Sequence, residues 1–155
     1  QFHREMLEEA GEGIVLVLDY GYDAASLYNP RGRRHGSLVS YRRHRVGRDL
    51  LDSPGEQDLT AHVNWDDLRR AAADCLWEEI ALMPLAEFLV RAGIGERVDE
   101  AGYGMEAELD ADTVTARQEI KRLLDPEGMG SDLKVLIQGR GELGRIAKEI
   151  LCEPL

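Results

Sequence analysis

The most apolar stretch of the chain is the run of five aliphatic residues at 14–18, which ends on Asp19, Tyr20 and Gly21. It is too short to cross a membrane, and it lacks the alternation of apolar and polar residues that is typical of a half-exposed strand. The run therefore predicts a strand that is buried on both faces, as in a parallel sheet covered by helices. Open α/β sheets bind ligands just past the carboxyl ends of such strands, so the three residues that follow are candidates for a site.

Apolar residues that recur every three or four positions predict helices along the rest of the chain. The expected helical ranges are 1–11, about 65–75, 84–93, 115–124 and 143–151. Asn64 is a suitable N-cap for the second of them, and Pro84 suits the first position of the third. Thr115 and Gln118 have the spacing of a capping box, which predicts that the fourth helix starts at Thr115.

Shorter apolar or alternating stretches predict further strands. These stretches lie at 36–41, 76–82 and 133–138, whereas 22–34 is typical of a loop and 52–55 of a tight turn. The acidic stretch at 95–112 is assigned to no element. Strands and helices in this order are typical of an α/β fold, here one with fewer strands than a complete sheet.

The composition is that of a globular protein of one domain. The chain has 155 residues, of which 43% are hydrophobic and 32% charged, and no apolar run approaches the ~20 residues that a bilayer requires. Its two cysteines, Cys75 and Cys152, lie far apart, and neither they nor the four histidines have the spacing of metal ligands. We therefore expect no metal, and free thiols in a reducing compartment, which predicts a cytoplasmic protein.

Charge is distributed unevenly along the sequence. The net charge is −11, yet residues 31–48 hold seven arginines and no acid, which leaves 12 basic and 30 acidic side chains elsewhere. The overall charge argues against a nucleic acid or an anionic membrane as partner of the whole surface. The arginine-rich segment could dock on its own protein, on an acidic partner or on a phosphate; the alternative is a solvated basic loop.

Two groups of polar residues are candidates for chemistry. Asp19 and Tyr20 would place a carboxylate and a phenol at the rim of a site, unless Asp19 caps a turn in which Gly21 supplies a positive φ. Asp58, Thr60 and His62 alternate, so on one strand they would share a face and could hold a substrate or move a proton. The alternative for this second group is a hydrogen-bonded network that anchors the loop to the next helix.

Two further features have simple alternatives. His44 stands between two arginines and could bind an acceptor group or a carboxylate, although an exposed loop histidine is the commoner case. Residues 139–144 have the form GxGxxG after a predicted strand. A dinucleotide site also needs an acid about 20 positions on, beyond a second strand, and this sequence shows none, so we interpret 139–144 as a turn.

Five blocks occur in order along the chain: LVLDYGYD, GSLVSYRRH, LLDSPGEQDLTAHVNWDDL, AEFLVRAGI and DPEGMGSDLKVLI. Together they resemble one family, the MidA-type S-adenosylmethionine-dependent methyltransferases, which includes a mitochondrial complex I assembly factor. They run from about Gly11 to Gln138 and resemble the C-terminal half of the family, most specifically in the segment PGEQDLTAHV at 54–63.

The resemblance implies the class I, Rossmann-like methyltransferase fold, with helices on both faces of the sheet. The strand at 14–18 would be the fifth of seven, and the strands near 77–82 and 133–138 would be the antiparallel pair at the sheet edge. In this family the glycine-rich cofactor loop and the acid that binds the ribose lie upstream. We therefore expect residues 1–155 to be the C-terminal, acceptor-side part of one domain, incomplete and inactive by itself, with S-adenosylmethionine bound mainly by the half that this sequence lacks.

The implied reaction is transfer of a methyl group from S-adenosylmethionine to a protein nitrogen, with arginine as the candidate. The residues assigned to catalysis are Asp19, Tyr20, Asp58 and His62, and those assigned to substrate binding are Gly21, His44 and Thr60. The expected partner is a protein substrate rather than a nucleic acid. A homodimer is also considered, because an unpaired strand edge can pair with a second chain. The alternative function is a non-enzymatic interaction or scaffold domain that uses the arginine-rich segment 31–48.

Overall fold

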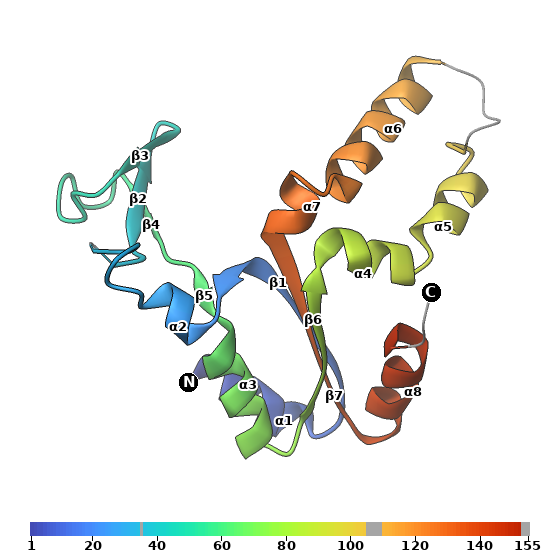
Figure 1. Ribbon diagram of the computed structural model, residues 1–155, viewed down its shortest axis with the longest axis horizontal. Helices are drawn as coiled ribbons and strands as arrows, with labels where there is room; N and C mark the ends of the chain where they lie inside the picture. The colour runs from blue at the N-terminus through green and yellow to red at the C-terminus, as the bar shows by residue number, and fades with distance from the viewer. Residues whose placement is uncertain (35, 105–109, 153–155) are drawn as a thin grey trace. The chain divides into compact units, whose positions relative to one another are not determined.

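The computed structural model describes residues 1–34, 36–104 and 110–152 and shows an α/β protein (Figure 1). The helices are α1 (Phe2–Ala10), α2 (Ala24–Leu27), α3 (Trp65–Asp74), α4 (Leu85–Arg91), α5 (Ile94–Glu100), α6 (Ala111–Leu124), α7 (Met129–Asp132) and α8 (Gly141–Cys152). The strands are β1 (Gly13–Tyr22), β2 (Val39–Arg42), β3 (Arg45–Gly47), β4 (Asp58–Thr60), β5 (Val63–Asn64), β6 (Glu78–Pro84) and β7 (Leu133–Arg140). The chain forms two compact units, a larger one of residues 1–19 and 69–155 and a smaller one of residues 20–68.

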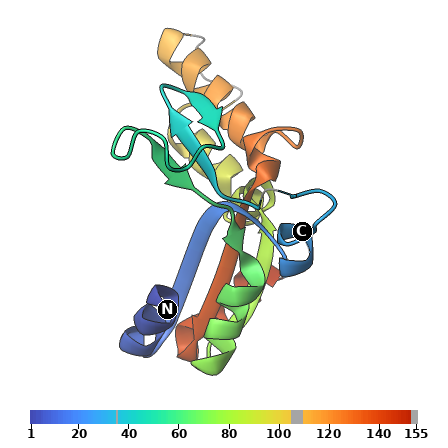
Figure 2. The same cartoon turned by 90° about the vertical axis from the view of Figure 1, so that its left-hand side faces the viewer.

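The sheet of the larger unit contains β1, β7 and β6 in that order, and the three strands run side by side in both views (Figures 1 and 2). β6 and β7 are antiparallel, with Glu78 opposite Gly139 at one end and Pro84 opposite Lys134 at the other. This confirms the antiparallel edge pair that the family resemblance implies. The register shifts between Glu79 and Ala81, a local irregularity of the kind that a β-bulge produces.

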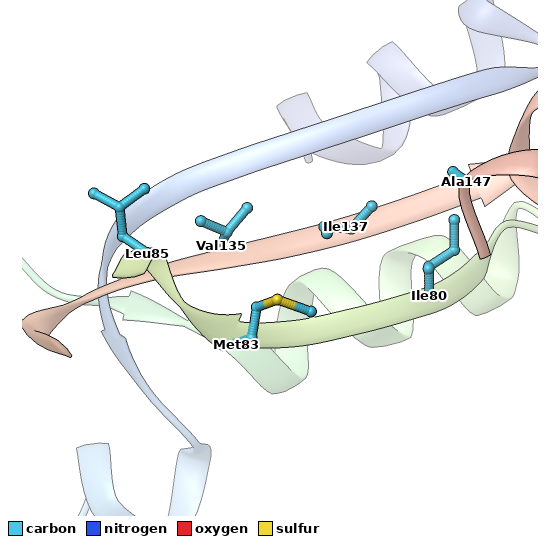
Figure 3. Packing of buried hydrophobic residues seen from close by; sticks show 6 residues of the cluster. All are labelled: Ile80, Met83, Leu85, Val135, Ile137 and Ala147. Carbon is cyan, nitrogen blue, oxygen red and sulfur yellow. The ribbon is translucent and has the colours of Figure 1, made fainter. Parts of the chain in front are cut away.

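The centre of the core is β7, which is buried on both faces. One face carries Val135 and Ile137, which pack with side chains from β6, α4 and α8 (Figure 3). This cluster consists of Ile80, Met83, Leu85, Val135, Ile137 and Ala147. Alternation along the strand places Leu136 and Gln138 on the other face, where both side chains are fully buried.

Helices α1 and α3 cover the second face of the sheet. Leu7 and Ala72 form a buried cluster with Cys75 and Trp77, and the indole nitrogen of Trp77 donates a hydrogen bond to the carbonyl oxygen of Leu7 at 3.1 Å. On the same side, Nε2 of His3 lies 2.8 Å from Oε1 of Gln138, which gives the buried amide a polar partner. Helices therefore lie on both faces, as the expected fold class requires.

The prediction that the strand at 14–18 is buried on both faces is wrong for the described chain. Ile14, Leu16 and Leu18 are 41%, 48% and 51% exposed, whereas Val15 on the opposite face packs against the cluster around Leu7. The reason is that the cluster built by α4 and α8 contains residues of β6 and β7 and none of β1. β1 thus has one covered face.

Most predicted helices are present, with corrections at their ends. Asn64 caps α3 as expected, since its Oδ1 accepts from the backbone N–H of Asp66 at 3.1 Å. Thr115 does not start a helix: α6 begins at Ala111 and is capped by Asp110, while the Thr115 hydroxyl donates to the carbonyl oxygen of Ala111. Pro84 is the N-cap of α4 rather than its first residue.

The stretch at 95–112, which the sequence assigns to no element, contains most of α5 and the start of α6. Residues 105–109 lie outside the described residues. The stretch at 22–34, expected to be a loop, contains the short helix α2.

The glycines at 139–144 serve close packing between β7 and α8. A Cβ on Gly139 would lie 2.6 Å from the Cα of Gly144, and Gly141 has a φ of 73° where the helix begins. Only glycine fits such a close approach of backbones. The prediction of a turn over 139–144 is wrong, because residues 139–140 end β7 and residues 141–144 already form the start of α8.

The smaller unit contains an antiparallel sheet with the strand order β3-β2-β4, visible at the upper left of Figure 1. Arg43 and His44 join β2 to β3 with φ values of 49° and 62°, the positive pair that a two-residue hairpin loop needs. The last residues of β1 pair with β5 in parallel, with Gly21 opposite Val63 and Tyr22 opposite Asn64.

Candidate functional site

The candidate site lies in the smaller unit, where β1 ends beside β5. The two strands pair in parallel at Gly21 and Tyr22. The chain continues from β1 into α2 and from β5 into α3. Asp66 of α3 fixes the start of α2, because its Oδ2 accepts from the backbone N–H of Ala24 at 2.8 Å. Asp23 caps α2 through the N–H of Ser26 at 2.6 Å. These carboxylates position the loop that follows.

Tyr22 and His62 form the centre of the site. Their rings meet edge to face, with centroids 5.1 Å apart and planes at 61°. The guanidinium carbon of Arg33 lies 4.2 Å from the centroid of Tyr22, a cation–π contact. Nδ1 of His62 is buried and has no hydrogen-bond partner among the described residues. A buried polar atom without a hydrogen bond lowers the stability of the fold by about 1–3 kcal/mol. A catalytic role is one reason why a protein keeps such an atom.

A cleft of about 650 Å³ opens beside these rings, within the range of about 300–1,000 Å³ that is usual for ligand sites. Besides Tyr22 and His62, its lining includes four arginines, which are Arg31, Arg33, Arg34 and Arg48. No acidic side chain belongs to the described lining. The cleft is therefore strongly positive in a chain whose net charge is negative.

The predicted site residues come together only in part. His62 lies between β4 and β5, so it is not on one strand with Asp58 and Thr60. Those two are exposed on β4, opposite Tyr41 and Val39 of β2, and do not line the cleft. The arrangement of all three on one strand face is thus wrong.

The other predicted residues are placed as follows. Asp19 is exposed and belongs to the larger unit, whereas Tyr20 is exposed at the start of the smaller one. His44 is exposed in the hairpin turn and does not line the cleft beside Tyr22 and His62. Gly21 does not have a positive φ, so the turn role considered for it is wrong. Its lack of a side chain makes room for Trp65.

Sequence reasoning missed Tyr22 and the four arginines as members of one site. The arginines stand out in the sequence as part of the segment 31–48, and Tyr22 directly follows the strand end that the first prediction singled out. The signal in the sequence is the position of these residues past the apolar run at 14–18, at or beyond the carboxyl end of β1. The sequence does not show that the ring of His62, forty residues later in the chain, contacts the ring of Tyr22.

Two other clefts have different chemistry. One of about 670 Å³ near β2 and β3 combines arginines with Asp49 and Asp52, and Arg42 there is ion-paired with Glu56. The other, of about 630 Å³, lies between α5 and α6 in the larger unit and is mainly apolar. Neither brings a histidine or a cysteine to its described lining.

Within residues 1–34, 36–104 and 110–152, no three side chains of His, Cys, Asp or Glu are grouped so that they could hold a metal ion. None of the helices in the described part of the chain combines the length and the apolar character that crossing a bilayer requires. Cys75 and Cys152 are both free thiols.

Comparison with known proteins places the chain in a family. Residues 1–81, more than half of the chain, match the family of S-adenosyl-L-methionine-dependent methyltransferases of the MidA type. The chain belongs to this family. It is 31% identical over 120 residues to "Protein arginine methyltransferase NDUFAF7, mitochondrial" of Danio rerio, a match that covers 76% of this chain and 25% of that protein.

Two crystal structures from Burkholderia thailandensis are also similar to this methyltransferase family member. One is a native, uncharacterised protein with a TM-score of 0.74, and the other, with a TM-score of 0.73, is bound to S-adenosyl-homocysteine. Both are 27% identical and match 90% of this chain, which covers 36% and 35% of their own lengths. The chain thus spans about a quarter to a third of the relatives that it matches, and the class I fold implied by the sequence is confirmed.

Proposed function

We propose that this chain forms the acceptor-binding side of an S-adenosylmethionine-dependent methyltransferase that modifies a protein nitrogen. Family membership supports the reaction class. The zebrafish relative is named as a protein arginine methyltransferase, which supports a protein as the acceptor and arginine as the first candidate. That relative is also named as mitochondrial, so the cytoplasmic location expected from the cysteines stays a prediction.

The observation that carries the proposal is the buried, unpartnered Nδ1 of His62 beside Tyr22. An acceptor nitrogen that is methylated must lose a proton, and a neutral imidazole nitrogen can take it. His62 is the described histidine that lines the cleft after β1, and α/β sheets bind their ligands at this end of a strand. We assign to His62 the role of holding the acceptor nitrogen or accepting its proton.

Tyr22 and Arg33 position this histidine. The edge-to-face contact restricts the ring of His62, and Arg33 stacked on Tyr22 restricts the phenol in turn. Methyl transfer depends mainly on alignment of the reacting atoms, so small changes in such positions reduce the rate strongly. The other residues predicted from the sequence remain predicted site residues: Asp19, Tyr20, Gly21, His44, Asp58 and Thr60. None of them takes the role that we assign to His62.

The described residues do not fit the cofactor well enough to assign its contacts. Among the described residues, the glycine-rich stretch at 139–144, where β7 passes into α8, is filled by the packing of Gly139 on Gly144 and leaves no cradle for a ligand. S-adenosylmethionine, when bound to such enzymes, supplies an electrophilic methyl group. We therefore derive from this chain only what its residues do to the acceptor, and we propose that the cofactor contacts come mainly from other parts of the protein.

The proposal is tested on the protein isolated from its native source at the length it has there. Cell extract is incubated with it and methyl-labelled S-adenosylmethionine, and label is then measured in protein, nucleic-acid and small-molecule fractions. We expect label in protein. Label confined to small molecules or nucleic acid would contradict the protein acceptor, and label in no fraction would favour the scaffold function of segment 31–48.

A variant tests the role of His62. His62→Gln is expected to lower the turnover number about a hundredfold or more, since a positioned acid or base contributes about 10²–10⁴-fold. His3→Gln is the matched control, because His3 contacts Gln138 in the larger unit. Circular dichroism shows whether both variants are folded. Equal turnover in the two folded variants would remove His62 from the mechanism.

A further inference from the structure

The charge of the cleft beside Tyr22 is opposite to that of the chain as a whole. Arg31, Arg33, Arg34 and Arg48 contribute to its lining, and no Asp or Glu does so among the described residues. The neighbouring cleft near β2 shows the usual alternative, since Arg42 there is paired with Glu56 and lies 3.9 Å from Asp52. Four guanidinium groups that share one cleft repel one another unless an anion joins them.

The arginines of this cleft are available for a ligand. No side-chain hydrogen bond or ion pair joins Arg31, Arg34 or Arg48 to another residue in the described part of the chain. Arg33 contacts the face of Tyr22, an arrangement that leaves the N–H groups at the edge of its guanidinium free to donate. Guanidinium groups bind carboxylates in paired hydrogen bonds, which makes them selective for such anions.

We propose that this cleft binds an acidic segment of the protein acceptor, through Asp or Glu side chains that flank the residue to be methylated. This inference rests on the proposed function and names the substrate feature that the site selects. A guanidinium of the acceptor at His62 would meet like charge from the arginines of the same cleft, and the carboxylates that flank it offset that charge. The flanking carboxylates anchor the segment and hold the target in register.

A short acidic segment fits better than a nucleic acid. Outside residues 31–48 the chain carries 30 acidic and 12 basic side chains. An extended polyanion that reaches beyond the cleft would be repelled by that surface, whereas a few carboxylates confined to the cleft would not. The observation therefore favours an acidic protein segment.

The test measures peptide binding without cofactor. The protein from its native source is titrated into a fluorescently labelled peptide in which one arginine is flanked by glutamates, and into a matched peptide with glutamines, while anisotropy is recorded. We expect the glutamate peptide to bind about tenfold or more tightly, and this preference to weaken as ionic strength rises. Equal affinities would overturn the proposal.

Variants locate the binding site. The double variant Arg31→Gln with Arg34→Gln is expected to weaken binding of the glutamate peptide about tenfold and to leave the glutamine peptide unchanged. Arg122→Gln with Arg145→Gln removes the same charge from helices of the larger unit and is expected to bind the glutamate peptide like wild type. An equal loss in both double variants would show a general charge effect and overturn the assignment to this cleft.

Two further results separate this inference from the proposed function. Methyl transfer to both peptides at equal rates would overturn the acidic-segment inference while the methyltransferase function stands. Glutamate-dependent binding that is lost in the Arg31 and Arg34 variant, with no methyl transfer to any peptide, would support the cleft and contradict the function. A single-stranded RNA that competes more strongly than the glutamate peptide would overturn the choice of a protein segment.

Discussion

Trp65 lies directly against the backbone of Gly21, so closely that a Cβ on Gly21 would be 2.5 Å from the indole nitrogen. The same Cβ would be 2.7 Å from the carbonyl oxygen of Val63, the residue opposite Gly21 in the parallel pair. Trp65 is 2% exposed, so it has little room to move away. The glycine at the end of β1 therefore provides the space in which α3 is anchored beside the candidate site.

The contact predicts that Gly21→Ala is destabilising. Overpacking of a filled position typically costs about 1–3 kcal/mol, and here both the indole and a backbone carbonyl are in the way. Urea unfolding measures the change. Gly32→Ala is the control, because nothing lies within 4 Å of its Cβ and its φ is not positive. The same unfolding midpoint for the two variants would contradict the close packing at Gly21.

The burial of the strands predicts different costs for two leucine truncations. Leu136 of β7 is fully buried, whereas Leu16 of β1 is 48% exposed. Leu136→Ala should lower the free energy of unfolding by about 2–5 kcal/mol because it leaves a cavity, and Leu16→Ala should lower it by well under half as much. Chemical denaturation of both variants measures the difference. Equal losses would show that another surface covers β1 in solution.

The strands illustrate what the sequence could and could not predict. The apolar runs at 14–18 and 133–138 both indicate strands, and both strands form. Which of them is central depends on where helices α4 and α8 pack, and that is a tertiary property. Because those helices cover β6 and β7, the less uniformly apolar run around Gln138 is the fully buried one, with His3 supplying a polar partner.

The candidate site shows the same limit. The sequence predicts His62 as a site residue because it would share a strand face with Asp58 and Thr60. The chain leaves β4 at Thr60, so His62 contacts Tyr22 instead. Alternate residues share a face of the sheet only when they lie on the same strand. The family resemblance could identify the region of the site, but the pairing of Tyr22 with His62 depends on the parallel contact between β1 and β5.

The cap of α6 predicts a pH-dependent contribution to stability. Oδ1 of Asp110 accepts from the backbone N–H of Thr113 at 2.7 Å, and this hydrogen bond lowers the pKa of Asp110 below its ordinary value of 3.8. The lowered pKa means that the cap stabilises the folded state above pH 3.8 and that this contribution is lost as the pH falls through the lowered pKa.

We therefore expect Asp110→Ala to be less stable than wild type at neutral pH and to approach it in strong acid. Thermal unfolding across that pH range measures the difference. Asp112→Ala is the comparison, since Asp112 lies in the first turn and does not cap the helix. A difference between Asp110→Ala and wild type that is the same at every pH would contradict the role of the charged cap.

The two thiols predict a two-step reaction with a thiol reagent. Cys152 is exposed near the end of α8, whereas Cys75 is buried in the cluster of α1 and α3, where its Sγ lies 3.9 Å from the carbonyl oxygen of Arg4. In the folded protein one thiol should react quickly, and the second only when α1 separates from α3 or the protein unfolds. Absorbance of a chromogenic disulfide reagent measures both phases. Cys152→Ser should remove the fast phase and Cys75→Ser the slow one. Two thiols that react at the same rate in the folded protein would mean that α1 does not stay packed over Cys75.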